Sequence, residues 1–384
     1  MSPNLKRCFV FPIVAAFGAT SSSGLLAAPT DITVRIGHAA PLTGGASHLG
    51  KDDENGARLA IEEINAHGLI IGGKTVTLQL DSEDDAGDPR QATQVAQKLV
   101  DDKVVAVIGH LNSGTSIPAS RIYSDAGIVE ISPSATNPTY TQQGFRTTYR
   151  LVATDAQQGP ALADYASKVL KARSVAIIDD STAYGQGLAN EFQNRAKSAG
   201  MTVVSHDAAT DKSIDFRAIL TKLKGERPDV IMYGGMDSTG GPLAKQAMQL
   251  AMNVKILAGD GVCTPKVAGL AGDASKNIIC SIAGMPLEKM EKGKAFESRY
   301  FARFNKQIEV YAPFTYDAVY IIVDAMKRAG SIEPANILAA MPSTAYAGVI
   351  GLTQFDSHGD LKRSTISLYE YVDGKQKLLD VLKM

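Results

Sequence analysis

The sequence has almost no net charge. Its 39 Lys and Arg residues are balanced by 40 Asp and Glu residues, which leaves a formal charge of −1 at pH 7. Phosphate backbones are bound through basic stripes, so this balance argues against a nucleic-acid partner. No hydrophobic run approaches the roughly 20 residues that span a bilayer. The sequence therefore indicates neither a nucleic-acid-binding nor a membrane-spanning protein.

The motifs of doubly wound enzymes are also missing. No Gly-x-Gly-x-x-Gly fingerprint lies between a predicted strand and helix, and the loop at 109–114 lacks the middle glycine. There is no phosphate-loop Lys and no Gly-x-Ser-x-Gly elbow. No metal-ligand spacing is formed by the six histidines, His38, His48, His67, His110, His206 and His358. We predict a protein that is not an enzyme and needs neither a cofactor nor a metal.

The first 28 residues have the order of a secretory signal peptide. The basic pair Lys6-Arg7 precedes an apolar stretch at 8–19, and small residues follow up to Ala28. An N-terminal anchor helix is the alternative, but the apolar stretch is too short to span a bilayer. We predict that residues 1–28 are removed and that the mature protein is periplasmic. Cleavage one residue earlier is equally compatible with the sequence.

Cysteine is scarce, and only three residues of this type occur. Cys8 lies within the predicted signal peptide, which leaves Cys263 and Cys280 in the mature chain. In an oxidising compartment such an even pair indicates a disulfide, and two separate buried thiols are the alternative.

The remaining chain alternates short apolar runs with amphipathic segments. Predicted strands lie at 32–36, 75–80, 104–108 and 128–131, and again at 174–178, 202–205, 229–233 and 255–258. Predicted helices lie at 50–66, from 88 onward, and at 115–126, 184–199, 215–224 and 241–251. Repeated β-α units predict parallel sheets covered by helices on both faces, and two series of them predict two similar lobes.

The pattern becomes helical after Cys280. We expect helices at 291–305, 313–329 and 334–341, then a hairpin that pairs 349–355 with 365–372 around the loop at 356–360. A chain that crosses back between the lobes would account for these late helices. The crossings are short and not glycine-rich, which indicates hinges and not a flexible tether.

Ligands of open parallel sheets bind beyond the carboxyl ends of the strands. After the strand at 104–108, a loop with Ser113 and Thr115 leads into a helix whose free N–H groups suit a carboxylate, although simple capping is the alternative. The next loop, at 132–138, is again rich in hydroxyl groups. In the second series, Tyr184 would face the same crevice. Asp260 could hold an ammonium group, or form an ordinary Asx turn.

The same loops give the chain a resemblance to the periplasmic branched-chain amino-acid-binding proteins. The matching segments follow the family order and lie at 39–44, 84–89, 109–111 with Ser113, 132–136, 184–187, 233–235 and 311–318. The resemblance implies an α/β protein with two doubly wound parallel-sheet lobes joined by a three-crossing hinge, the type I periplasmic binding protein fold. It places the first lobe at 31–152 plus 285–355 and the second at 153–284 plus 356–384.

The resemblance also implies a set of ligand-binding residues. Ser113 and the N–H group of Thr136 would hold the ligand carboxylate, while the Thr136 hydroxyl, the Ser134 carbonyl and Asp260 would hold its ammonium. Tyr184 would reach across from the second lobe. The ligand side chain would meet Leu49, Leu111, Asn112, Met236 and Tyr311.

Two departures from the family pattern affect the expected ligand. The amine-binding acid of the family is commonly Glu, and Asp260 is one methylene shorter. Leu49 and Met236 stand where relatives often carry aromatic residues, so the pocket could admit a bigger ligand.

The implied function is that of the extracytoplasmic solute-binding component of an ABC importer. Its expected partners are a small amino acid, branched-chain or otherwise apolar, and an inner-membrane ABC permease. We expect a monomer, because a monomer suits delivery of the ligand to a permease. A non-amino-acid ligand, such as an amide or an aromatic acid, and a role as a ligand-sensing co-receptor are the alternatives.

Overall fold

The computed structural model describes residues 1–4, 6, 8–10 and 31–384. The core of the predicted signal peptide, at 11–30, lies outside these described residues. Within the described part, no helix is both long and apolar enough to cross a membrane.

The first sheet has six strands within residues 31–384, in the order β2-β3-β1-β4-β5-β6. The strands are β1 (Asp31–Ala40), β2 (Leu69–Ile71), β3 (Lys74–Asp84), β4 (Ala106–Gly109), β5 (Val129–Ser132) and β6 (Thr148–Arg150). All neighbours run parallel except β2, which is antiparallel to β3.

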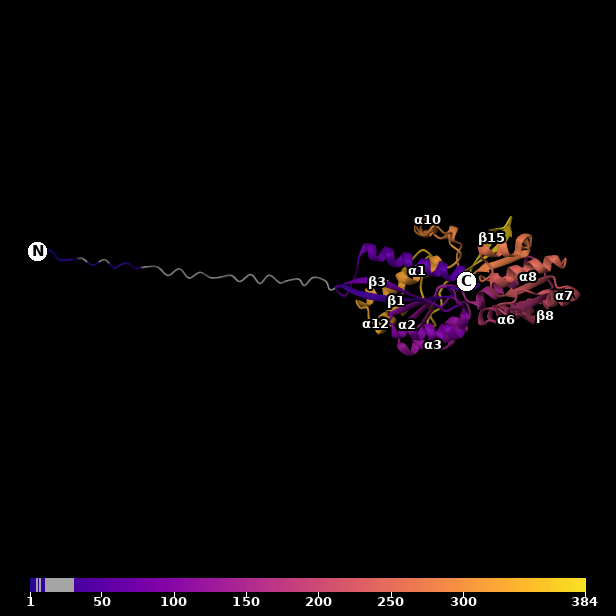
Figure 1. Ribbon diagram of the computed structural model, residues 1–384, viewed down its shortest axis with the longest axis horizontal. Helices are drawn as coiled ribbons and strands as arrows, with labels where there is room; N and C mark the ends of the chain where they lie inside the picture. The colour runs from indigo at the N-terminus through magenta and orange to yellow at the C-terminus, as the bar shows by residue number, and fades with distance from the viewer. Residues whose placement is uncertain (5, 7, 11–30) are drawn as a thin grey trace.

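Helices cover both faces of this sheet, and together they form what we call the first lobe (Figure 1). The helices of this lobe are α1 (Ser47–His67), α2 (Pro89–Asp101), α3 (Ser113–Ala126), α4 (Thr139–Gln142), α10 (Gly293–Phe304), α11 (Ala312–Ala329) and α12 (Pro334–Ala340). Alternate β4 residues point to opposite faces. Ala106 and Ile108 join the core that includes α1 and α11, while Val107 joins the core under α2 and α3.

The second sheet has seven strands within the described residues, in the order β15-β14-β11-β10-β9-β7-β8. The strands are β7 (Ser174–Asp179), β8 (Thr202–Ala208), β9 (Val230–Gly234), β10 (Lys255–Ala258), β11 (Ile278–Ile282), β14 (Thr365–Val372) and β15 (Lys375–Lys383). The last two are antiparallel additions at one edge. With α5 (Asp155–Lys168), α6 (Ala183–Ser198), α7 (Arg217–Glu226), α8 (Asp237–Gln249) and α9 (Pro265–Ala271), this sheet forms the second lobe.

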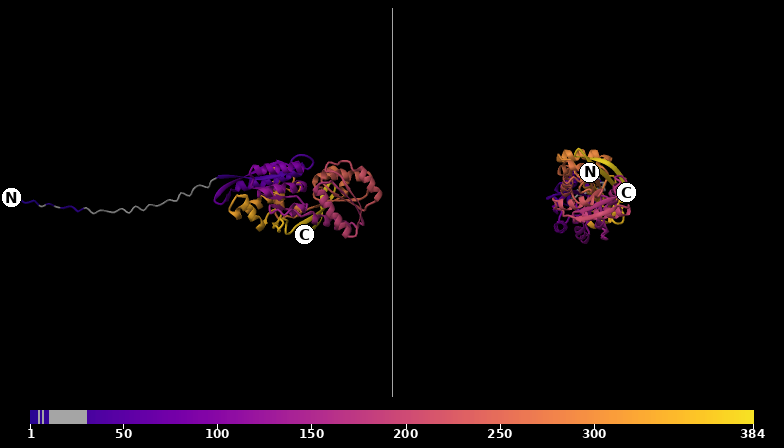
Figure 2. Two further views of the ribbon diagram at one scale, coloured as in Figure 1. Left: turned by 90° about the horizontal axis from the view of Figure 1, so that it is seen from below. Right: turned by 90° about the vertical axis from the view of Figure 1, so that its right-hand side faces the viewer.

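The chain crosses between the lobes three times, as expected. It leaves the first lobe after β6, returns after β11 to add α10 to α12, and crosses again to add β14 and β15. Figure 2 shows the two bodies side by side, with the late orange helices packed on the early violet elements. The crossings are joined to one another, because Ala153 N–H donates to the Ala283 carbonyl and Arg150 N–H to the Gly359 carbonyl, each at 3.0 Å. The predicted fold class is confirmed.

Local sequence signals account for several of these boundaries. Asp88 caps α2, the helix predicted from 88 onward, since its carboxylate accepts from the N–H groups of Arg90 and Gln91, and Pro89 occupies the first turn. The predicted disulfide between Cys263 and Cys280 is also present. It ties the loop after β10 to β11, the next strand of the sheet.

The predicted terminal hairpin is wrong. Within 349–355, only β13 (Leu352–Thr353) is a strand, and it pairs with β12 (Tyr346–Ala347). β14 pairs instead with β15, through a tight turn in which Asp373 and Gly374 both have positive φ. The loop at 356–360 is held together internally, because the Asp356 carboxylate accepts from the backbone N–H groups of His358 and Asp360.

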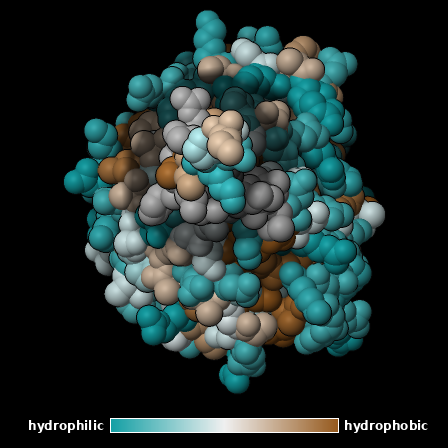
Figure 3. Space-filling model, turned by 90° about the vertical axis from the view of Figure 1, so that its left-hand side faces the viewer, coloured by the Kyte–Doolittle hydropathy of each residue, from teal (hydrophilic) through white to brown (hydrophobic). Residues whose placement is uncertain are grey.

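The surface seen from the first-lobe end is mainly hydrophilic, with apolar residues in small groups (Figure 3). Among the residues that the structure describes, few large apolar side chains are well exposed, and they include Ile70 and Leu352. Such scattered exposure is normal for a globular protein.

Candidate ligand-binding site

Eight of the ten side chains predicted to bind the ligand line one small cavity. They are Leu111, Asn112, Ser113, Ser134, Tyr184, Met236, Asp260 and Tyr311, and Gly261 completes the lining. The lining follows the carboxyl ends of β4 and β5 in the first lobe and of β9 and β10 in the second, where parallel sheets place their ligands. The other two, Thr136 and Leu49, are fully buried but are not among the residues that line it.

The N-terminus of α3 presents free donors beside this cavity. Asn112 precedes the helix but makes no side-chain capping bond. Ser113 and Thr115 do not cap it either: the Ser113 hydroxyl accepts from Asn137 N–H at 3.2 Å, and the Thr115 hydroxyl donates to the Asn112 carbonyl at 2.9 Å. Within the described residues, the Ser113 N–H has no protein acceptor. The positive end of the helix is therefore available to an anion.

The loop after β5 is held in shape by the buried Arg150 guanidinium. Its Nη1 donates to the Ala135 carbonyl at 2.6 Å and its Nη2 to the Asn137 carbonyl at 3.1 Å. Its Nε donates to Asp360 in the third crossing, at 2.5 Å. These bonds flank Thr136, whose buried hydroxyl has no hydrogen-bond partner within the described residues. Arg150 thus links the loop to the hinge.

The Asp260 carboxylate joins two tyrosines from opposite lobes. Tyr184 of α6 donates to its Oδ1 at 3.1 Å, and Tyr311, which precedes α11, donates to its Oδ2 at 2.5 Å. Asp260 is only 2% exposed, and burial raises its pKa, while the two phenol hydrogen bonds oppose this rise. Its side chain therefore faces the cavity and does not form a simple Asx turn.

Tyr311 is placed by a carboxylate of the first lobe. The buried Asp52 of α1 accepts from the backbone N–H groups of Val310, Tyr311 and Ala312 at 2.8 to 3.0 Å. It thereby caps α11, the helix that follows Tyr311, and fixes where the tyrosine ring leaves the backbone.

Two polar residues missed by the sequence analysis lie beside Asp260. Asp155 is fully buried, and neither of its carboxylate oxygens has a partner within the described residues, although the Thr136 hydroxyl is close. Burial raises its pKa well above the usual range, and the charge of Asp260 raises it further. Gln158 is likewise buried near Asp260 without a well-formed hydrogen bond from its amide. Buried polar groups are normally paired, so the Asp155 carboxylate makes this cluster a candidate binding site for a group that donates hydrogen bonds.

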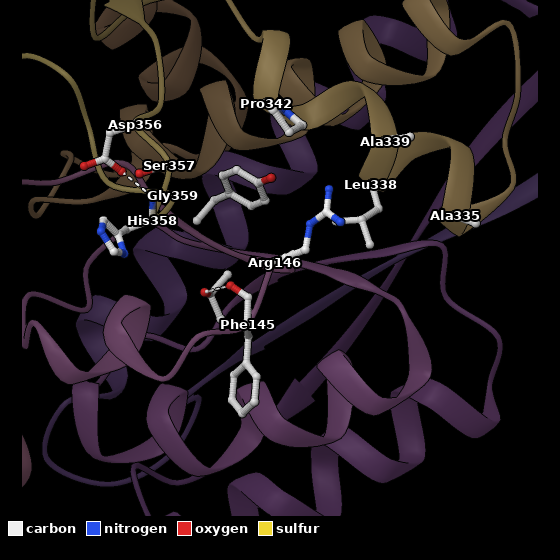
Figure 4. Close-up of a pocket in the computed structure, with 12 residues that line it drawn as sticks. Phe145, Arg146, Ala335, Leu338, Ala339, Pro342, Asp356, Ser357, His358 and Gly359 are labelled. Atoms are coloured by element: carbon white, nitrogen blue, oxygen red, sulfur yellow. Dashed lines mark hydrogen bonds between the residues drawn. The ribbon is translucent and has the colours of Figure 1, made fainter.

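Larger depressions exist outside the cleft. One lies on the first lobe, where the Arg146 side chain points toward Leu338 of α12 (Figure 4). None of the residues that line it carries a buried polar atom without a partner. The small cleft cavity, which has such atoms next to it, is the better candidate for a specific site.

Two parallel-sheet lobes, three crossings and a polar cavity built from strand ends of both lobes define a type I periplasmic binding protein fold. The chain belongs to the periplasmic binding protein family, whose model matches residues 33–376.

Relatives and solved structures agree with this assignment. The chain is 36% identical to an amino acid binding protein of Pseudomonas aeruginosa, over 88% of this chain and 90% of the relative. It is 35% identical to a Leu/Ile/Val-binding protein homolog of Brucella abortus, over 94% of each. The crystal structure of the substrate-binding protein LivJ of Streptococcus pneumoniae with isoleucine matches at a TM-score of 0.83 and 28% identity, over 92% of this chain and 100% of that chain.

Proposed function

We propose that the protein is the extracytoplasmic solute-binding component of an ABC importer, and that it binds an apolar, branched-chain amino acid between its lobes. One observation carries this proposal. The uncapped N-terminus of α3 at Ser113 and the buried acid Asp260 converge on a single small cavity, and the buried Asp155 lies close enough to Asp260 to feel its charge.

The chemistry of these two groups matches an amino acid zwitterion. A charge that leaves water must be satisfied by hydrogen bonds or an opposite charge. The α3 N-terminus and the Ser113 hydroxyl would hold the ligand carboxylate. Asp260, with Ser134, Thr136 and Asp155, would hold the ammonium through charge-assisted bonds.

The remaining wall suits an apolar side chain. Leu111, Met236 and Tyr311 line the cavity. The names of the relatives, which bind Leu, Ile and Val or amino acids generally, support this choice. Asn112 lines the same cavity and adds an amide group, whose carbonyl oxygen is buried and without a partner within the described residues.

We further propose a cycle of capture and delivery without chemical conversion. Residues 1–28 direct export to the periplasm, and the ligand enters an open cleft between lobes formed by 31–152 plus 285–355 and by 153–284 plus 356–384. Ligand contacts from both lobes then favour closure. The Tyr311–Asp260 bond joins the lobes, so it must break when they separate. A permease would accept the closed form of the monomer.

A thermal-shift panel tests the class of ligand. The refolded mature protein is mixed with each L-amino acid, D-leucine, small amides and benzoate. A true ligand raises the melting temperature in proportion to the logarithm of its concentration above Kd. We expect a rise with L-leucine, L-isoleucine or L-valine and none with D-leucine. A rise with benzoate or amides alone would overturn the proposed amino acid while leaving the fold unaffected.

A further inference from the structure

The two lobes also meet outside the cavity, through His48 in the first turn of α1. His48 belongs to the first lobe. Its Nε2 lies 2.8 Å from Asp237 Oδ2, and its Nδ1 lies 3.4 Å from Lys266 Nζ. Asp237 and Lys266 belong to the second lobe, in the first turns of α8 and α9. The imidazole of one lobe is therefore held between an acid and a base of the other.

The donors and acceptors of this contact are mutually consistent. An ammonium group only donates, so the His48 Nδ1 accepts from Lys266, and the Nε2–H then donates to Asp237. Asp237 is fully buried, and its Oδ2 also accepts from the Thr264 hydroxyl at 2.6 Å, which fixes the carboxylate. Lys266 Nζ makes a second bond across the lobes, to the Gly45 carbonyl at 3.2 Å.

The charges around His48 favour the same arrangement. Burial raises the pKa of Glu309 in the first lobe, the Asp237 carboxylate of the second lobe raises it further, and the Lys266 ammonium lowers it. Without Lys266, the Glu309 and Asp237 carboxylates would oppose each other across the closed cleft. The Lys266 ammonium offsets that repulsion when the lobes meet.

The contact is attached directly to the ligand cavity. Met236 lines the cavity, and it is the N-cap residue of α8, directly before Asp237. His48 is likewise followed by the buried Leu49 of α1. A bond between His48 and Asp237 therefore holds the segment that carries Met236, a residue of the cavity wall, against the start of α1 in the other lobe.

We propose that His48, Asp237 and Lys266 form an interlobe clasp that determines how long the closed protein retains its ligand, with His48 as a positioning residue. The inference rests on the proposed function, because it takes the cavity as the ligand site. The clasp bonds exist only when the lobes are together, so they stabilise the closed state over the open one. Ligand enters and leaves through the open state, so the clasp slows dissociation, and it also slows association by lowering the open fraction of the ligand-free protein.

The test compares His48→Ala with the wild type in two measurements. L-leucine is the probe for ligand dissociation, followed by tyrosine fluorescence in a stopped-flow instrument, since the chain has 13 Tyr and no Trp. Small-angle X-ray scattering of the ligand-free protein reports lobe separation. We expect dissociation to be roughly 10-fold faster in His48→Ala, as for loss of a hydrogen bond to a charged group. The ligand-free radius of gyration should be larger, and the association rate should rise with the open fraction.

Two further variants make the result specific. His48→Gln keeps a side-chain N–H donor for Asp237 and should restore part of the slow dissociation. Lys51→Ala is the control, because Lys51 is on the same helix but pairs only with Glu54 of its own lobe among the described residues. It should behave as the wild type in both measurements.

The outcomes separate this inference from the proposed function. If His48→Ala melts like the wild type, and neither its dissociation rate nor its ligand-free radius of gyration differs, the clasp is refuted. If L-leucine does not bind the wild type, the proposed ligand is wrong. The ligand-free scattering then decides alone, and an unchanged radius of gyration in His48→Ala overturns the clasp.

Discussion

Tyr311 of the first lobe donates a 2.5 Å hydrogen bond to Asp260 of the second lobe, inside the cavity where the lobes meet. Tyr184 donates to the other oxygen of the same carboxylate. Asp260 is thus a buried acid that is solvated by phenol groups instead of water. Burial disfavours the charged form of Asp260, and a ligand ammonium would stabilise that form by its opposite charge. We therefore expect binding to depend most on Asp260.

Asp260→Asn should weaken L-leucine binding at least roughly 100-fold, because breaking a buried ion pair costs about 3 to 5 kcal/mol. Isothermal titration calorimetry measures the change. Asp164→Asn is the control, since Asp164 of α5 is partly exposed and pairs with Arg195 and Lys168 away from the cavity. Equal affinities for Asp260→Asn and the wild type would remove Asp260 from the site.

Arg150→Lys should disturb the site through its supporting loop. A Lys ammonium cannot reproduce the planar fork that reaches the Ala135 and Asn137 carbonyls and Asp360 together. We expect the free energy of unfolding to fall by about 2 to 3 kcal/mol and L-leucine affinity to fall with it. Urea unfolding and calorimetry measure the two effects. The exposed Arg146→Lys serves as the control, and a fully stable Arg150→Lys with normal affinity would contradict this role.

His38 should make the protein less stable in mild acid. Burial lowers its pKa from 6.5 to about 4. Between these values the unfolded chain binds a proton at this residue and the native protein does not. The free energy of unfolding is therefore unaffected by His38 above pH 6.5, and it falls by roughly 3 kcal/mol as the pH falls towards 4.

Urea unfolding of wild type and His38→Gln across pH 4 to 7 tests this dependence. In His38→Gln the free energy of unfolding should no longer fall by this amount between pH 7 and 4. In the control His67→Gln, a variant of the exposed His67, it should fall as in the wild type. Parallel pH profiles for His38→Gln and wild type would show that His38 does not titrate differently on folding.

The Cys263–Cys280 disulfide should stabilise the second lobe. The two residues are 17 positions apart, and a loop of that length is expected to contribute about 3 kcal/mol. The double variant Cys263→Ala/Cys280→Ala should lose about that amount of unfolding free energy while keeping its ligand affinity, because neither cysteine lines the cavity. The wild type in dithiothreitol should match the variant, and a stability insensitive to both treatments would disprove the stabilising role.

The fold was predictable where sequence signals are local and regular. The strand at Val230–Gly234 is a continuous apolar run, and the α2 helix begins at an Asp-Pro cap, so both could be recognised from the sequence. β6 could not, because it has three residues, of which Arg150 is charged and buried only through long-range partners. α5 contains Gly159 and Pro160, which obscure its helical pattern.

The site could be predicted only in part for a similar reason. Loops after predicted strands pointed to Ser113 and Asp260, which both line the cavity, because position in a parallel sheet is a property of the sequence order. Asp155 follows a capping Thr154 and looks like an ordinary acid of a first helical turn. Its burial beside Asp260 results from how the first crossing meets the second lobe, which no local pattern reveals.

The central claim is that the cavity binds both charges of an amino acid, and calorimetric titration with L-leucine, 4-methylpentanoate and isoamylamine tests it most directly. The second compound lacks the ammonium group and the third lacks the carboxylate. The account predicts that L-leucine binds and that each analogue binds at least roughly 100-fold more weakly, because each leaves one set of buried polar groups unpaired. Binding of 4-methylpentanoate as tight as that of L-leucine would contradict the account, because Asp260 and Asp155 would then have no ammonium to bind.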